Sequence, residues 1–104
     1  MKVAYFGGGI HSADGWRAQA LRGLREKYPA SEITEINAGI CDCVRGSGFS
    51  VYRFAHDVLK QQPDLVLVDF ASDDYQTDAG TIQRTIEGVA RQARTASPGL
   101  DLLF

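Results

Sequence analysis

The sequence predicts one small α/β domain, in which helices cover both faces of a parallel sheet. Two stretches carry this prediction. Residues 2–7 form an apolar run that ends in three glycines, and the residues after the glycines have helical spacing. This order of strand, turn and helix is typical of an open α/β sheet. Residues 64–71 are almost continuously apolar, which is typical of a central parallel strand buried on both faces. With 104 residues the chain has room for a single core.

The first half of the chain supplies a helix, a strand and a second helix. Residues 14–27 have helical spacing that places Trp16 and Tyr28 toward the core, and Pro29 follows the helix. Residues 32–40 alternate between polar and apolar and predict a strand, reached by a right-handed crossover. We expect the second helix at residues 49–61. Its predicted inner face comprises Tyr52, Ala55, His56 and Leu59, and Pro63 stops it.

The second half supplies a third helix and a fourth strand. Thr77 or Asp78 can cap the helix. Its apolar stripe comprises Ile82, Ile86, Val89, Ala90 and Ala93, and Pro98 follows it. Residues 100–104 predict a strand whose apolar edge would leave backbone groups unpaired. We expect a second copy of the chain to pair with this edge and form a homo-oligomer; a longer parent protein and a folded-over strand are the alternatives.

Composition excludes several classes of protein. The chain is 44% hydrophobic and 23% charged, with a net charge of −2, so it has neither a disordered composition nor a basic footprint for nucleic acid. No apolar run approaches the length of a membrane span. Cys41 and Cys43 lie too close together for a stabilising disulfide, which indicates a reducing, cytoplasmic location. The two thiols either fill space or serve a redox or metal role.

Three blocks of the sequence carry a resemblance. Residues 7–16 are GGGIHSADGW and resemble a block of the type GGSITEGAGW. Residues 37–40 and 53–59 resemble NAGI followed by an RxxxDVL helix, and residues 63–74 resemble PDLVFVEFAVND. In this order, over nearly the whole chain, the blocks resemble the SGNH/GDSL hydrolases, in particular their polysaccharide-esterase-like branch. The resemblance implies a three-layer flavodoxin-like sheet, for which we predict strand order 2-1-3-4, with residues 1–104 as one domain truncated relative to the family.

The chain departs from this family at the positions that carry its chemistry. By the resemblance, Gly9 stands at the place of the nucleophilic serine, and Asp73 at that of the oxyanion-hole asparagine. Asp42 falls at the oxyanion-hole glycine, although the longer loop also allows Gly46 or Gly48 there. The family's C-terminal Asp and His block would lie beyond the last residue. Acyl transfer needs a nucleophile, a base and oxyanion donors, so no catalytic residue of the family type is predicted.

The strand ends nevertheless predict a ligand cleft with an acidic rim. Its predicted residues are Gly8, Gly9, Ile10, His11, Asp42, Asp73 and Asp74. A divalent metal could bind to His11, Cys41, Cys43 and Asp73; helix capping and solvent exposure are the alternative explanation of these groups. Asp69, within the apolar strand, either meets a hydrogen-bond partner at the strand end or is buried with a raised pKa. No cofactor is predicted.

We therefore predict a degenerate SGNH-hydrolase-like domain that binds a small molecule of unknown identity or another protein and does not hydrolyse esters. The alternative is a residual or repurposed ester hydrolase, acting through a metal or a nucleophile that the family does not use. Ser12, Ser47, Cys41 and Cys43 are the candidate nucleophiles, with His11 or His56 as base.

Overall fold

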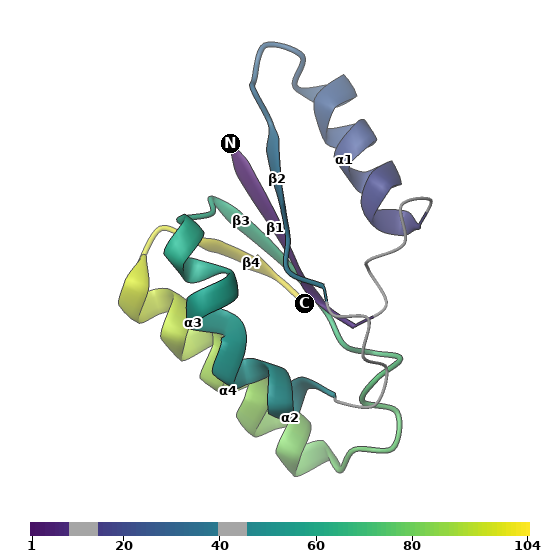
Figure 1. The fold of residues 1–104 in the computed structure, drawn as a ribbon, viewed down its shortest axis with the longest axis vertical. Helices are drawn as coiled ribbons and strands as arrows, with labels where there is room; N and C mark the ends of the chain where they lie inside the picture. The colour runs from purple at the N-terminus through teal and green to yellow at the C-terminus, as the bar shows by residue number, and fades with distance from the viewer. Residues whose placement is uncertain (9–14, 40–45) are drawn as a thin grey trace.

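The structure, a computed structural model, describes residues 1–8, 15–39 and 46–104, and its centre is a parallel sheet of four strands (Figure 1). The strand order is β2-β1-β3-β4, which confirms the predicted order. The strands are β1 (Lys2–Gly7), β2 (Thr34–Asn37), β3 (Leu65–Asp69) and β4 (Asp101–Leu103). Consecutive pairing of Val3 with Leu65 through Gly7 with Asp69 brings the carboxyl ends of β1 and β3 together.

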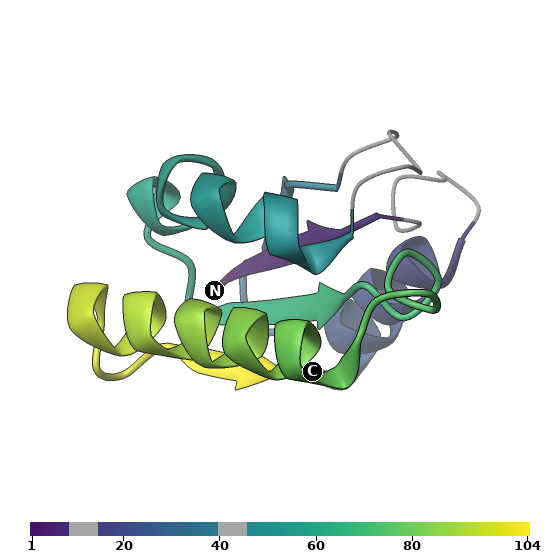
Figure 2. The same ribbon diagram turned by 90° about the horizontal axis from the view of Figure 1, so that it is seen from below.

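Helices cover both faces of the sheet, as predicted. Helix α1 (Trp16–Lys27) lies on one face, and α4 (Ala79–Ala96) with the short helices lies on the other (Figures 1 and 2). Because side chains alternate along a strand, Val3 and Tyr5 pack with Leu21 of α1, whereas Ala4 and Phe6 join the larger core on the opposite face. Phe6 is fully buried between Phe54 and Phe70, with ring centroids 5.0 and 5.2 Å away.

The predicted helix over residues 49–61 is a series of short pieces, so the prediction of one regular helix was wrong. The pieces are α2 (Ser47–Ser50), η2 (Val51–Arg53), α3 (Phe54–Asp57) and η3 (Leu59–Gln61). Two of them are 3₁₀ turns with three residues per turn, and this shifts the buried face away from the 3.6-residue pattern. Phe54 and Val58 are buried; of the predicted set Leu59 is partly buried against the core, whereas Ala55 and His56 are exposed and Tyr52 is 85% exposed.

Helix α4 starts where the sequence indicated. The Asp78 carboxylate caps it by accepting a hydrogen bond from the Thr81 amide at 2.9 Å. Val89 and Ala93 are buried as predicted, but Ile86 is 39% exposed. Arg94 donates hydrogen bonds to the carbonyls of Pro98 and Leu100, which fixes the turn into β4.

Two further expectations differ from the structure. The second strand is shorter than the predicted residues 32–40. Trp16 and Tyr28 are not core residues, since each is partly exposed. Trp16 instead packs edge-on against the buried Tyr5 ring at 5.8 Å, and this burial raises the pKa of the Tyr5 hydroxyl. In the described ranges, no helix is both long enough and apolar enough to span a bilayer.

Candidate ligand cleft at the strand ends

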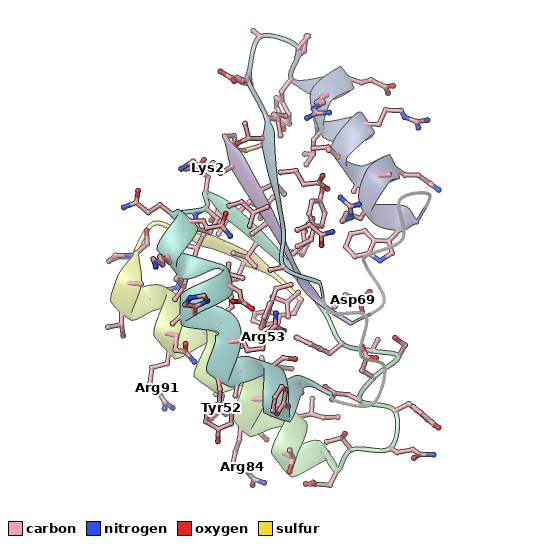
Figure 3. All side chains as sticks on the ribbon, in the orientation of Figure 1. Lys2, Tyr52, Arg53, Asp69, Arg84 and Arg91 are labelled. Atoms are coloured by element: carbon pink, nitrogen blue, oxygen red, sulfur yellow. The ribbon has the colours of Figure 1, made fainter. Side chains whose placement is uncertain are left out.

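The candidate site lies where β1 and β3 end. Figure 3 shows Asp69 at this end of β3, well away from Lys2 at the start of β1. Gly8 continues from β1, and its amide donates a hydrogen bond of 3.3 Å to the Asp69 carbonyl. The chain after β3 then turns back on itself, because the Phe70 carbonyl accepts hydrogen bonds from the amides of Asp73 and Asp74 at 2.9 and 2.8 Å. This turn brings two carboxylates to the strand ends.

The Asp73 carboxylate lies directly against the glycine turn. A Cβ atom built on Gly8 would collide with the carboxylate oxygens of Asp73, so only glycine leaves room for this acid. Gly8 and Asp73, which the sequence assigned to one cleft, are therefore neighbours in space. A carboxylate accepts hydrogen bonds and carries negative charge, so this position repels a developing oxyanion.

Asp74 has a structural partner. Its Oδ1 atom accepts a hydrogen bond of 2.9 Å from the Ser47 amide, in a buried position at the start of α2. Gly46 lies so close to Asp74 that an added Cβ would collide with the same oxygen. Ser47 is 2% exposed, and its hydroxyl has no hydrogen-bond partner among the described residues. This hydrogen bond joins the turn after β3 to the segment between residues 37–40 and residues 53–59.

Replacing Asp74 tests this attachment. Asp74→Ala would leave the buried Ser47 amide without its acceptor and is expected to lower the free energy of unfolding by about 1–3 kcal/mol. Asp74→Asn retains an oxygen that can accept the bond, so its effect should be smaller. Urea unfolding of both variants measures the difference. Equal effects of the two substitutions would contradict the assigned hydrogen bond.

Asp69 follows the first of its two predicted alternatives. It ends β3, and its Oδ1 atom accepts a hydrogen bond of 3.1 Å from the Ala71 amide. The carboxylate therefore stabilises the turn that leads to Asp73.

The other predicted cleft and metal residues lie outside the described part of the chain. These are Gly9, Ile10, His11, Cys41, Asp42 and Cys43, together with Ser12 among the alternative nucleophiles. Within the described ranges, no group of three or more His, Cys, Asp and Glu side chains could hold a metal ion. The metal hypothesis thus remains a prediction from the sequence.

His56 lies on α3 and is 79% exposed. Its Nδ1 atom is 2.8 Å from Oδ1 of Asp57, whose carboxylate also forms an ion pair with Arg53. The hydrogen bond to His56, followed by the charge of Arg53, lowers the pKa of Asp57. His56 lines a hollow of about 280 Å³ beside Asn37, and no described residue of that hollow carries a hydroxyl or thiol nucleophile. Its assignment as a catalytic base therefore gains no support here.

The hydrogen bond between Asp74 and Ser47 could not be predicted from the sequence. The bond joins residues 27 positions apart, so no local pattern contains it. The features of the sequence that could have indicated this hydrogen bond are Gly46, directly before Ser47, and the two aspartates that follow the buried strand.

A parallel α/β sheet with polar loops at the carboxyl ends of its strands defines the general class of this protein: an open-sheet domain with its candidate cleft at those ends. No protein-family model matches the chain. No curated protein matches it either. Solved structures do.

The similar structures are esterases and related lipolytic proteins. A two-domain esterase active on acetylated mannans, crystallised with mannopentaose, superposes with a TM-score of 0.80 at 27% identity over 98% of this chain. An acetyl xylan esterase gives a TM-score of 0.74 at 23% identity over 99%. A G-D-S-L family lipolytic protein from Desulfitobacterium hafniense gives 0.72 at 19% over 97%. The protein therefore has the SGNH/GDSL hydrolase fold.

The likeness covers only part of each neighbour. The chain spans 28% of the two-domain esterase and 56% of each of the other two proteins.

Proposed function

We propose that this chain acts as a binding or interaction module built on the SGNH fold and does not hydrolyse esters. The observation that carries the proposal is the Asp73 carboxylate lying against Gly8 at the end of β1. The resemblance places an amide donor at this position in the family, and an amide stabilises an oxyanion where a carboxylate opposes it.

Two sequence positions support the same conclusion. Gly9 offers no side chain that could attack an acyl carbon, and Asp42 adds a second acid where it, rather than Gly46 or Gly48, takes the place of the oxyanion-hole glycine. A site can bind a ligand without a nucleophile or oxyanion donors. Gly8 and the acidic turn after β3 still lie together at the carboxyl ends of the strands, so ligand binding can persist without hydrolysis.

The alternative is a residual or repurposed ester hydrolase in the same cleft. Its substrate would be an acetyl ester of a polysaccharide, the chemistry named for two of the structural neighbours. Of the candidate nucleophiles, Ser47 is the one that lies within the described residues, and its hydroxyl is buried beside Asp74 without a hydrogen-bond partner there. A metal-assisted variant of this alternative would use His11, Cys41, Cys43 and Asp73 as ligands. A hydrolysis assay with p-nitrophenyl acetate separates the module from the hydrolase.

We further propose that β4 pairs with a second copy of the chain, in the cytoplasm. Leu103 and Phe104 are more than half exposed at this edge strand, and β4 is paired on one side only, to β3, within the described residues. A second β4 would satisfy the backbone groups of this edge and cover Leu103.

Light scattering after size exclusion tests this pairing. We expect a dimer mass at micromolar concentration. Leu102→Pro is expected to shift the mass toward the monomer, because proline removes a ladder donor from the edge. A monomeric mass for the unaltered chain across that concentration range would contradict the proposal.

A further inference from the structure

A hollow of about 500 Å³ lies between β3, the following loop and the first half of α4. This volume is within the range of small-molecule sites. Most of its surface is apolar, and the apolar residues that line it include Val68, Phe70, Tyr75, Ile82, Ile86 and Phe104. Tyr75, Ile86 and Phe104 are all exposed, so the hollow opens to the surface through large apolar groups.

The hollow also has a polar part. Ser47, Asp69 and Asp74 contribute to its lining. The Ser47 hydroxyl is buried without a hydrogen-bond partner among the described residues, and such a group is satisfied by a ligand atom or by water. It can donate to or accept from a ligand. Asp74 uses Oδ1 for the Ser47 amide, and a carboxylate has capacity for further hydrogen bonds.

The charge of the lining is one-sided. Two acidic residues line the hollow, and none of its described lining residues is Lys, Arg or His. A carboxylate or phosphate ligand would therefore meet only like charge and no cationic partner. An ammonium group would gain a charge-assisted hydrogen bond in the same place.

We infer that this hollow binds a small organic amine with an apolar, ring-sized body. The ring packs between Ile82, Ile86 and Phe70, and the amine lies toward Ser47 and Asp74. This inference rests on the proposed binding role and deepens it by naming a class of ligand. The hollow and the candidate cleft have Ser47 and Asp74 in common.

Three indole compounds of nearly equal size test the inference: tryptamine, tryptophol and indole-3-acetate, which differ in an amine, a hydroxyl and a carboxylate. Each is titrated into the ¹⁵N-labelled full chain and followed by amide NMR. Tryptamine is expected to shift the amides of Val68, Ala71, Ile82 and Ile86 and to bind at least about tenfold more tightly than indole-3-acetate. Tryptophol should fall between them.

Two variants provide the controls. Ile86→Lys places a cation at the partly exposed rim and is expected to remove the preference for the amine. Tyr52→Ala should leave binding unchanged, because Tyr52 lies on the outer side of the helical layer with Arg84 and Arg91, away from Asp69 (Figure 3). The dispersion of the NMR spectrum shows in each case that the variant is folded.

Three outcomes would overturn the inference. The first is equal binding of the three compounds, and the second is amide shifts confined to residues outside the hollow. The third is occupation of the hollow by a second copy, seen when the amides of the hollow shift with protein concentration alone. Ester hydrolysis is measured separately. Ester turnover by the unaltered chain would overturn the proposed module. If the unaltered chain shows neither turnover nor a preference for the amine, only the proposed ligand class is overturned.

Discussion

Phe6→Ala is expected to lower the free energy of unfolding by about 3–5 kcal/mol, the largest effect of any single substitution considered for this protein. Phe6 has no exposed surface and packs against the rings of Phe54 and Phe70. Truncation to alanine removes the buried ring and leaves a cavity that three different elements would have to fill. A domain of this size has a total stability of about 5–15 kcal/mol, so this change removes a large fraction of it.

Urea unfolding followed by circular dichroism measures this effect. Tyr52→Ala is the matched control, because it also removes an aromatic ring but from a side chain that is 85% exposed. Its effect should stay within about 0.5 kcal/mol. Phe70 begins the turn that carries Asp73 and Asp74, so Phe6→Ala should also loosen the candidate cleft. Equal unfolding midpoints for the two variants would show that Phe6 is not at the centre of the core.

Gly7→Ala is expected to destabilise the protein by about 1–3 kcal/mol. Gly7 and Asp69 pair where β1 and β3 end, and a Cβ atom on Gly7 would collide with the Asp69 carbonyl. Because the obstacle is backbone, no side-chain rotation relieves it, and the two strand ends would have to separate. The Gly8 and Asp73 contact, one residue further along, would then be lost with them.

Gly23→Ala is the control for this substitution. Gly23 lies inside α1, and an added Cβ would meet no described atom within 4 Å. Alanine in a helix interior is more favourable than glycine, so Gly23→Ala should stabilise the protein by about 0.5–1 kcal/mol. The two glycine substitutions should therefore shift the urea midpoint in opposite directions. Shifts of the same sign would contradict the close approach of β1 and β3.

Much of the fold could be predicted because its causes are local. The apolar run around Val66 identified the central strand, and the two candidate caps Thr77 and Asp78 identified the start of α4, where Asp78 is the cap. The broken helix at residues 47–61 could not be predicted in this way. Its path depends on α4, where Gly88 allows the close approach of Val51 and the Gln92 side chain donates a hydrogen bond to the Val51 carbonyl at 3.1 Å. These contacts join segments that are distant in sequence.

The candidate cleft was predictable to a similar extent. The contact of Gly8 with Asp73 follows from the meeting of parallel strand ends, which the sequence order implies. The role of Asp74 did not follow, since its acceptor function depends on where Ser47 lies in the folded chain. The apolar hollow was also missed. The helical pattern assigned Ile82 and Ile86 to the core, and only the folded structure leaves Ile86 partly exposed at an opening.

The hydrolysis of p-nitrophenyl acetate tests the central claim most directly. The chain is expected to release p-nitrophenol no faster than buffer alone, because the Asp73 carboxylate lies against Gly8 and, by the resemblance, Gly9 stands at the place of the nucleophilic serine. Gly9→Ser should remain inactive as well, since Asp73 still opposes an oxyanion. Saturable turnover by the unaltered chain, abolished by Ser47→Ala or by another single substitution in these loops while the fold is retained, would contradict the account.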